Sequence, residues 1–219
     1  MNVFDMIGPV MIGPSSSHTA GAVRIGFIAA ALLGEAPVQA DILLHGSFAK
    51  TYKGHGTDKA LIAGILGMQP DDARIRFSQQ LAKNSGLVIN LAPGNIENAH
   101  PNTARITLRG ASGKQISVQG ASVGGGYINI TQVNGMAVEI TGQYVTFIVL
   151  HRDAPGTIAR VTELLAQQGT NICNFHLSRE ERGGVAVMTI EVDGRTDLAM
   201  NTAVEKLPNV ISSTMLIPN

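Results

Sequence analysis

The stretch VTFIVLHRDAPGTIARVTELLAQQG, residues 145–169, holds the pattern that decides the fold of the second half of the chain. Residues 145–153 are mostly apolar and rich in β-branched side chains, as in a buried strand. Residues 154–169 then place apolar side chains at the spacing of one helix face and stop at Gly169. The stretch therefore predicts a strand that leads directly into an amphipathic helix.

The alternation of strand and helix continues to the end of the chain. Two further strands, a helix and a last strand are expected at 170–180, 184–194, 196–207 and 210–218. The resulting order, βαββαβ, is that of the ferredoxin-like unit. We assign residues 146–219 to this domain and the short glycine-containing stretch 135–145 to a linker.

Residues 1–134 show a different mixture of helix and strand signals. A helix is expected at 18–33, because serines that can cap it precede an Ala-, Ile- and Leu-rich run that stops at Gly34. A second helix is expected at 58–68, capped by Thr57 after a glycine-containing loop. Strands are expected at 38–46, 86–93, 104–110, 114–123 and 127–135. The sequence therefore predicts an α+β protein of two domains.

The charge balance argues against one large class of partners. Lys and Arg together number 16, as do Asp and Glu, and no basic stripe or arm is present. With no Trp and few aromatic residues, platforms for stacking bases are also lacking. Nucleic acid is therefore not expected as a partner. No apolar run has the length of a membrane span, and the start of the chain does not resemble a signal peptide, so we expect a cytoplasmic protein without membrane contact.

Cysteine content limits the metal chemistry of the chain. Cys173 is the only cysteine, so no intrachain disulfide can form. An iron–sulfur cluster normally takes three or four thiolates, so this chain cannot hold one alone. Histidines at metal-ligand spacings such as HxH or HxxxH are also missing, and no metal site is expected in this chain.

The stretch GPSSSHTAG, residues 13–21, places three hydroxyls and an imidazole at the start of the first helix. One serine is enough to cap a helix, so Ser15, Ser16 and Ser17 favour a site for an anion, a carboxylate or a phosphate, over redundant caps. His18 lies in the first turn, where the helix dipole disfavours its cationic form. A neutral imidazole there can accept a proton.

The stretch KGHGTDKA, residues 53–60, repeats this arrangement before the second helix. Glycines on both sides of His55 expose its imidazole and let the backbone approach a ligand closely, which a purely structural loop does not need. Thr57, Asp58 and Lys59 follow at the helix start. This stretch is therefore a second candidate for binding or acid–base chemistry.

Other motifs argue against two further chemistries. The serine run lacks the G-x-S-x-G elbow of serine nucleophiles. The glycine-rich SVGGGYI, residues 122–128, precedes a strand rather than a helix and is therefore not a dinucleotide-binding loop. A third polar stretch, HPNT at 100–103, contributes His100 and Asn102 as weaker candidates. Together the motifs indicate recognition of a small carboxylate beside neutral imidazoles.

These motifs also resemble a known family. IGPSSSHTAG, HGSFAKTYKGHGTDKA, HPNT and SVGGGYI, followed by the ferredoxin-like unit, closely resemble the β chains of bacterial iron–sulfur L-serine dehydratases. The resemblance covers essentially the whole chain. It implies an enzyme that converts L-serine to pyruvate and ammonia, with a separate α chain that ligates a [4Fe–4S] cluster acting as Lewis acid on the serine hydroxyl. It also implies that this chain is inactive without that α chain.

The resemblance suggests roles for the candidate residues. His55 is the first choice for acid–base work, and His18 is the second. The donors for the substrate carboxylate are expected among the remaining polar candidates: Ser15, Ser16 and Ser17, supported by Thr57, Asp58 and Lys59, and more weakly by His100 and Asn102.

The second domain resembles the ACT domain, a small-molecule sensor of amino-acid metabolism. The resemblance lies in LHRDAPGTIARV, residues 150–161, and NICNFHLSRE, residues 171–180. In that family amino acids often bind at the turn before the first helix, between paired domains. A ligand site or an interface is therefore expected at Asp153, Ala154, Pro155 and Gly156, and self-association through this domain is expected with it. The two histidines of this domain, His151 and His176, are interpreted as structural.

Two alternatives are open at this point. The first domain also resembles the allosteric substrate-binding domain of some 3-phosphoglycerate dehydrogenases, which binds an anion without catalysis. The ACT unit motivates the main alternative, a non-catalytic, amino-acid-sensing regulatory subunit, and a purely structural assembly subunit is the other. The histidine-bearing loops favour the catalytic interpretation, because Arg or Lys serves a simple anion site better.

Overall fold

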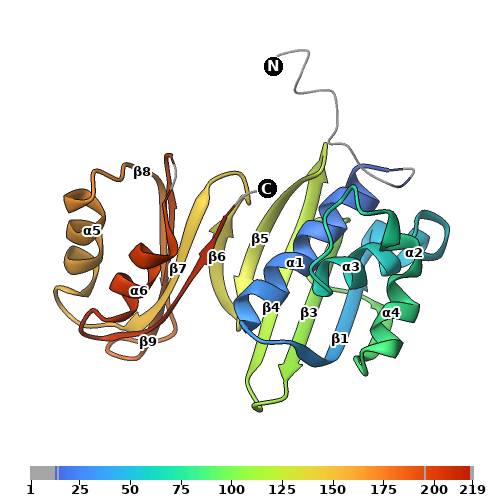
Figure 1. Ribbon diagram of the computed structural model, residues 1–219, viewed down its shortest axis with the longest axis horizontal. Helices are drawn as coiled ribbons and strands as arrows, with labels where there is room; N and C mark the ends of the chain where they lie inside the picture. The colour runs from blue at the N-terminus through green and yellow to red at the C-terminus, as the bar shows by residue number, and fades with distance from the viewer. Residues whose placement is uncertain (1–12, 14, 195, 218–219) are drawn as a thin grey trace. The chain divides into compact units, whose positions relative to one another are not determined.

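The computed structural model describes residues 13, 15–194 and 196–217. The chain divides into two compact units, Met1–Gly135 and Met136–Asn219. Each unit packs helices against strands, as Figure 1 shows, and each is described separately below. The α+β fold class is confirmed.

The first unit packs its helices on one face of a sheet (Figure 1). Its strands follow the spatial order β2-β1-β3-β4-β5, with β1 parallel to β2 and the other neighbours antiparallel. The strands are β1 (Pro37–His45), β2 (Val88–Gly94), β3 (Thr103–Gly110), β4 (Gln115–Gly124) and β5 (Tyr127–Val133). The helices are α1 (Ala22–Leu33), α2 (Gly46–His55), α3 (Thr57–Ile65) and α4 (Ser78–Asn84); a π-helical turn (Ser17–Gly21) precedes α1, and a 3-10 turn (Ala73–Phe77) precedes α4.

Two glycines let α1 and α3 pack with their backbones in contact. A Cβ on Gly26 of α1 would lie 2.3 Å from the carbonyl oxygen of Leu61. A Cβ on Gly64 of α3 would lie 2.0 Å from the carbonyl oxygen of Val23. Both distances are far below van der Waals contact, so only glycine fits at either position. This contact fixes α1, which follows the serine motif, against α3, which follows His55.

The second unit contains the predicted ferredoxin-like domain. Its four-stranded sheet has the order β10-β7-β9-β8, all antiparallel. The elements are β6 (Met136–Ile140), β7 (Val145–Arg152), α5 (Thr157–Gln167), β8 (Ile172–Arg179), β9 (Val185–Val192), α6 (Leu198–Glu205) and β10 (Val210–Leu216). Alternate residues of β7 and β9, among them Phe147 and Ile190, pack with Val161 and Leu165 of α5 to form its core. The βαββαβ prediction from β7 to β10 is confirmed.

Helix α2 differs from the sequence prediction. Residues 53–56 were expected as a loop, but Gly54 and His55 form the last turn of α2. The helical periodicity of the α2 sequence is weak, because Phe48 is the only buried residue of α2 and two glycines lower its helix propensity. Thr57 was expected to cap α3, but its side chain makes no capping hydrogen bond, and Gly56 in the left-handed region occupies the N-cap position.

The segment 135–145, predicted as a linker, contains strand β6. Its buried residues alternate with exposed ones, as in a half-buried strand. Thr189 of β9 donates a hydrogen bond to the carbonyl oxygen of Glu139. The backbone N–H and the hydroxyl of Thr141 both donate to Oε1 of the buried Glu191, at 2.8 Å each. The end of β6 is therefore held by hydrogen bonds to the second sheet.

Candidate functional site

His18 lies in the π-helical turn that leads into α1, and only 8% of its surface is exposed. Each ring nitrogen faces a hydroxyl: Nδ1 lies 3.3 Å from Oγ of Ser15, and Nε2 lies 3.3 Å from Oγ of Ser47. Phe48 packs against the ring, with the two centroids 5.2 Å apart. The imidazole is thus enclosed between the serine motif and the first turn of α2.

His55, the last residue of α2, meets His18. The two ring centroids are 4.6 Å apart and the ring planes cross at 75°, an edge-to-face arrangement. Gly56, with φ of +71°, turns the chain from α2 into α3 directly after this residue. His55 is exposed, whereas His18 is buried. The two histidines predicted for acid–base work therefore share one site.

The environment of His18 favours its neutral form. Burial lowers the pKa of His18 below its ordinary value of 6.5, and the neighbouring His55 lowers it further. Both effects act against a positive charge, because a buried cation loses hydration and a second imidazolium repels it. The sequence also predicted a neutral imidazole here, but from the helix dipole. In the structure, burial is the largest cause.

Of the three serines, Ser15 is the one that contacts His18. Its Oγ accepts a hydrogen bond from the backbone N–H of His18 at 3.3 Å, in addition to facing Nδ1. Its carbonyl oxygen accepts from the N–H of Thr19 at 2.8 Å. Ser16 is the residue at the N-cap of the turn, yet its side chain makes no capping bond. Ser16 and Ser17 are half-buried and directly precede His18 in the sequence, so they remain candidate ligand donors.

The HPNT stretch supports α2. The carbonyl oxygen of Pro101 accepts the N–H of Ser47 at 2.7 Å. Nδ1 of His100 accepts the N–H of Asn102 at 3.1 Å, and the backbone N–H of Ser122 donates to the carbonyl oxygen of Asn102 at 3.0 Å. None of the hydrogen bonds in the described residues joins the side chain of His100 or Asn102 to the histidine pair. Their contacts hold this loop to its neighbours.

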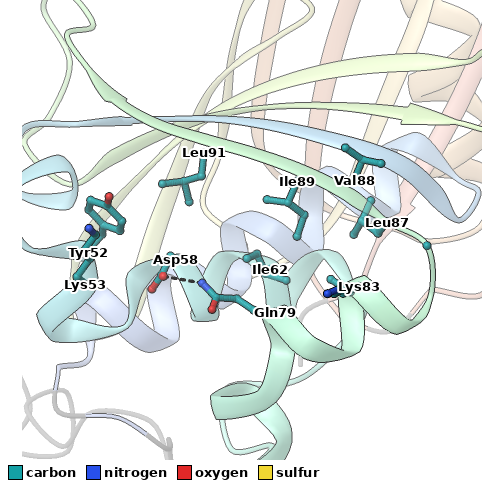
Figure 2. A pocket seen from close by; sticks show the side chains of 12 residues that line it. Tyr52, Lys53, Asp58, Ile62, Gln79, Lys83, Leu87, Val88, Ile89 and Leu91 are labelled. Carbon is teal, nitrogen blue, oxygen red and sulfur yellow. Dashed lines mark hydrogen bonds between the residues drawn. The ribbon is translucent and has the colours of Figure 1, made fainter.

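Asp58 faces a different part of the first unit. Its Oδ2 accepts a hydrogen bond from the side-chain amide of Gln79 on α4 at 2.8 Å. Figure 2 shows both residues in a pocket of about 720 Å³, bounded by α2, α3, α4 and β2, with Tyr52 and Lys53 at one end and Lys83 at the other. Neither His18 nor His55 lines this pocket.

The other two residues of the α3 start make local contacts. The carbonyl oxygen of Lys59 accepts from the hydroxyl of Ser78 at 2.7 Å. The hydroxyl of Thr57 is buried without a hydrogen-bond partner among the described residues. The structure therefore brings His55 and Ser15 each to His18, whereas no hydrogen bond or ion pair among the described residues joins Thr57, Asp58 or Lys59 to this group.

Ser47 is the residue that sequence reasoning missed. It lies within the quoted stretch HGSFAKTYKGHGTDKA, but nothing in its local pattern indicates a role. The available signal is positional: Gly46 and Ser47 directly follow a buried strand, where loops at strand ends carry functional groups. Contact with His18 depends on the tertiary fold, which local sequence does not reveal.

Comparison with known proteins identifies the family. Residues 2–93 match the profile of the serine dehydratase beta chain, and residues 147–212 match an AHAS small subunit-like ACT domain. The chain is 44% identical over 215 residues to the probable L-serine dehydratase beta chain of Bacillus subtilis, which covers 98% of this chain and 97% of that one. The chain belongs to the L-serine dehydratase β-chain family.

Two other relatives differ in kind: one is a serine dehydratase β chain, and the other is a 3-phosphoglycerate dehydrogenase. The β chain is 39% identical over 204 residues to the L-serine dehydratase beta chain of Peptoniphilus asaccharolyticus, covering 93% and 92% of the two chains. It is 29% identical over 130 residues to D-3-phosphoglycerate dehydrogenase of Methanocaldococcus jannaschii, covering 59% of this chain and 24% of that one. The resemblance expected from the sequence motifs and the ACT domain are both confirmed.

In the ACT unit of this β chain, the carboxylate of Asp153 holds the turn from β7 to α5. Oδ2 of Asp153 forms a 2.7 Å ion pair with Arg179 and accepts the N–H of Gly183 at 3.0 Å. The Gly183 N–H, and then Arg179, hold the pKa of the Asp153 carboxyl below its ordinary value. A pocket of about 400 Å³ opens here, lined by Asp153, Ala154, Pro155, Gly156, Ile158, Arg179, Arg182 and Gly183. All four residues predicted for a ligand or interface therefore line one pocket.

The residues of the β chain do not fit an iron–sulfur cluster. Within residues 13, 15–194 and 196–217, no three His, Cys, Asp or Glu side chains are grouped so that they could hold a metal ion. Cys173 is exposed on β8 of the second unit, and desolvation, followed by the nearby Asp193 and Glu191, raises the pKa of its thiol. Such a thiol is a poor thiolate ligand. Separately, none of the described helices is both long and apolar enough to cross a membrane.

Proposed function

We propose that this chain is the β subunit of an L-serine dehydratase that forms pyruvate and ammonia from L-serine together with a separate α chain. Membership of the β-chain family supports this proposal. The observation that carries it is the contact between the buried His18 and the exposed His55. The elimination of water from serine requires removal of the Cα proton, and an accessible imidazole backed by a neutral one can accept it.

His55 is the proposed acid–base residue. It is exposed, and no hydrogen bond among the described residues occupies its ring nitrogens. His18 has both of its nitrogens occupied by serine hydroxyls and is closed off from solvent. A group that exchanges a proton with substrate must reach it within hydrogen-bond distance, which favours His55 over His18.

Hydroxyl groups beside the pair are proposed to bind the substrate carboxylate. Ser16 and Ser17 serve best, because Ser15 already contacts His18. We keep Thr57, Asp58, Lys59, His100 and Asn102 as outer contributors, which shape the loops around the pair. Neutral donors orient a carboxylate without adding a cation that would repel a protonated His55.

The [4Fe–4S] cluster is proposed as the contribution of the α chain. The described residues of the β chain offer no ligand set for it, and the sequence has a single cysteine. A bound cluster with an open iron position supplies Lewis-acid activation of a hydroxyl leaving group. The β chain then supplies proton transfer and carboxylate recognition. This division makes the chain inactive when it is alone.

The pocket at Asp153–Gly156 favours an additional sensor role for the second unit. Its helix N-terminus and the arginines at 179 and 182 suit a carboxylate, and its volume suits an amino acid. We propose that this pocket binds a small amino acid or contacts a second ACT unit. A purely regulatory β chain would bind its ligand here and need neither histidine of the first unit.

Anaerobic reconstitution with the cluster-bearing α chain tests the proposal. We expect no pyruvate from the β chain alone and L-serine-dependent pyruvate from the complex. His55→Ala in the complex should lower kcat by about 100-fold or more, the usual contribution of a general base. His176→Ala, in the second unit, is the matched control and should retain activity. Undiminished turnover in a His18→Ala, His55→Ala double variant would support the regulatory alternative instead.

A further inference from the structure

The ring of His18 is held on four sides. Hydroxyls of Ser15 and Ser47 face its two nitrogens, while Phe48 and His55 contact the ring itself. Neither nitrogen has an open direction toward an incoming molecule, and the residue is almost fully buried. His18 therefore supports its neighbours in the site. The two serine hydroxyls determine which tautomer of its ring is favoured.

The direction of the hydrogen bonds around His18 gives the tautomer. Oγ of Ser15 already accepts the backbone N–H of His18, so the hydroxyl proton of Ser15 is available to donate to Nδ1. A neutral imidazole has one N–H and one acceptor nitrogen. With Nδ1 as the acceptor, the ring proton lies on Nε2 and is donated to Oγ of Ser47. In this arrangement every polar group of His18 and Ser15 has a partner.

The opposite tautomer makes the same number of hydrogen bonds in a less favourable arrangement. A proton on Nδ1 would direct two N–H donors of His18, backbone and ring, at the single Oγ of Ser15. The hydroxyl hydrogen of Ser15 would then be free, as that of Ser47 is in the Nε2–H form. In the Nε2–H form the bonds instead run in one direction, from the backbone N–H of His18 through Ser15 and the ring to Ser47, and each polarises the next. The Nε2–H form is therefore the favoured one.

Ser47 connects this tautomer to His55. Both residues belong to α2, with Ser47 in its first turn and His55 at its end, and His18 contacts both. The position of Ser47 is itself fixed, because its N–H donates to the carbonyl oxygen of Pro101. A ring that is hydrogen-bonded at one end of α2 and packed against the other end holds its orientation relative to the helix.

We propose that Ser15 and Ser47 are positioning residues, which hold His18 as the neutral Nε2–H tautomer so that His18 orients the ring of His55 for proton transfer. This proposal rests on the proposed function for its catalytic consequence. Its structural content, the tautomer and its dependence on two serines, stands independently. In this arrangement the hydroxyl hydrogen of Ser47 is left free, because its oxygen acts as the acceptor.

Nitrogen-15 NMR of the full-length chain with labelled histidine tests the structural content at about pH 7.5, where unperturbed histidine is largely neutral. We expect His18 to show a protonated Nε2 and an unprotonated Nδ1. Ser47→Ala should introduce the Nδ1–H form and shift the His55 ring signals. Ser47→Thr, which keeps a hydroxyl, should restore the original pattern. Ser85→Ala removes a comparable hydroxyl at the end of α4 and should change neither histidine.

Activity of the reconstituted complex tests the catalytic content. Ser47→Ala should lower kcat by about 10–100-fold, as removal of an orienting partner commonly does, with a much smaller change in KM. Ser47→Thr should recover most of kcat. An unchanged tautomer in Ser47→Ala, or a doubly protonated His18 in the native chain, would overturn the proposal. If Ser47→Ala loses the Nε2–H tautomer but keeps its kcat, His18 does not orient His55. If the native complex forms no pyruvate, the proposed function is contradicted, but the tautomer result still holds.

Discussion

The backbone N–H of Ser47 donates a 2.7 Å hydrogen bond to the carbonyl oxygen of Pro101. This bond ties the start of α2 to the HPNT loop before β3, and α2 carries His55 at its other end. Gly46 makes the contact achievable, because its φ is +59° and a Cβ there would lie 2.5 Å from the same carbonyl oxygen. The placement of the histidine pair therefore depends on a backbone contact between the first turn of α2 and a loop distant from it in sequence.

Gly46→Ala should destabilise the chain by about 1–3 kcal/mol, because the new methyl group clashes with Pro101 and the backbone is left-handed there. Urea unfolding of the full-length chain measures the change. Gly54→Ala is the matched control, since its Cβ meets open space within the same helix. That variant should be neutral or stabilising by about 0.5–1 kcal/mol. Equal losses in the two variants would contradict the role given to the Pro101 contact.

The stability of the chain should fall with acidification in a way that depends on His18. Its folded pKa lies below 6.5, so between that pKa and 6.5 the unfolded chain binds a proton that the folded chain does not. The loss begins near pH 6.5 and is complete below the folded pKa. His18→Gln should weaken this dependence, as measured by urea midpoints at about pH 7.5 and pH 5. An identical pH dependence in the variant would exclude His18 as its source.

Glu191→Leu should destabilise the chain by about 1–3 kcal/mol. The carboxylate is 2% exposed and accepts both hydrogen bonds from Thr141, as well as one from Asn174 at 3.2 Å. Leucine leaves those half-buried donors without the carboxylate acceptor. Glu139→Leu, at an exposed position of β6, is the control and should change stability by much less. If the Thr141 amide exchanges faster in Glu191→Leu but not in Glu139→Leu, the loss of stability comes from the hydrogen bonds to Thr141.

Asp153→Asn should loosen the turn at the start of α5. The neutral amide weakens the pairing with Arg179 and the acceptance of the Gly183 N–H, both of which are bonds to a charged oxygen. We expect faster amide hydrogen exchange at Gly183 and little change in overall stability, because the ion pair is partly exposed. Asp193→Asn, a second surface carboxylate of this unit, serves as control. Unchanged exchange at Gly183 would show that backbone contacts alone hold the turn.

The ferredoxin-like half could be predicted well because its signals are local. β7 is a mostly apolar run rich in β-branched residues, α5 carries a strong period-3.6 pattern, and Gly169 marks the helix end as expected. Helix α2 could not be predicted this way, because it buries only Phe48 and contains two glycines. Strand β6 has an alternating pattern, but it is short and flanked by turn residues, so it resembles a linker.

The sequence identified the types of residue in the candidate site but only some of the contacts between them. Glycine-flanked exposure identified His55, and the helix-start position identified His18. The partners of His18 could not be assigned, because Ser47 reaches it only through the fold and the Pro101 contact. The direction of the Asp58 side chain could not be predicted either. A carboxylate in the first turn can face either side of its helix, and Asp58 bonds to Gln79 on α4.

The close approach of α1 and α3 at Gly26 and Gly64 has a consequence for engineering. Because main-chain atoms meet there, the separation of α1 and α3 depends little on the side chains that surround the contact. Substitutions at Ser16 and Ser17, the proposed carboxylate donors, are therefore expected to leave the separation of the two helices as it is. A single methyl group at residue 26 or 64 would instead push the two helices apart and change that separation without altering any residue proposed to bind the substrate.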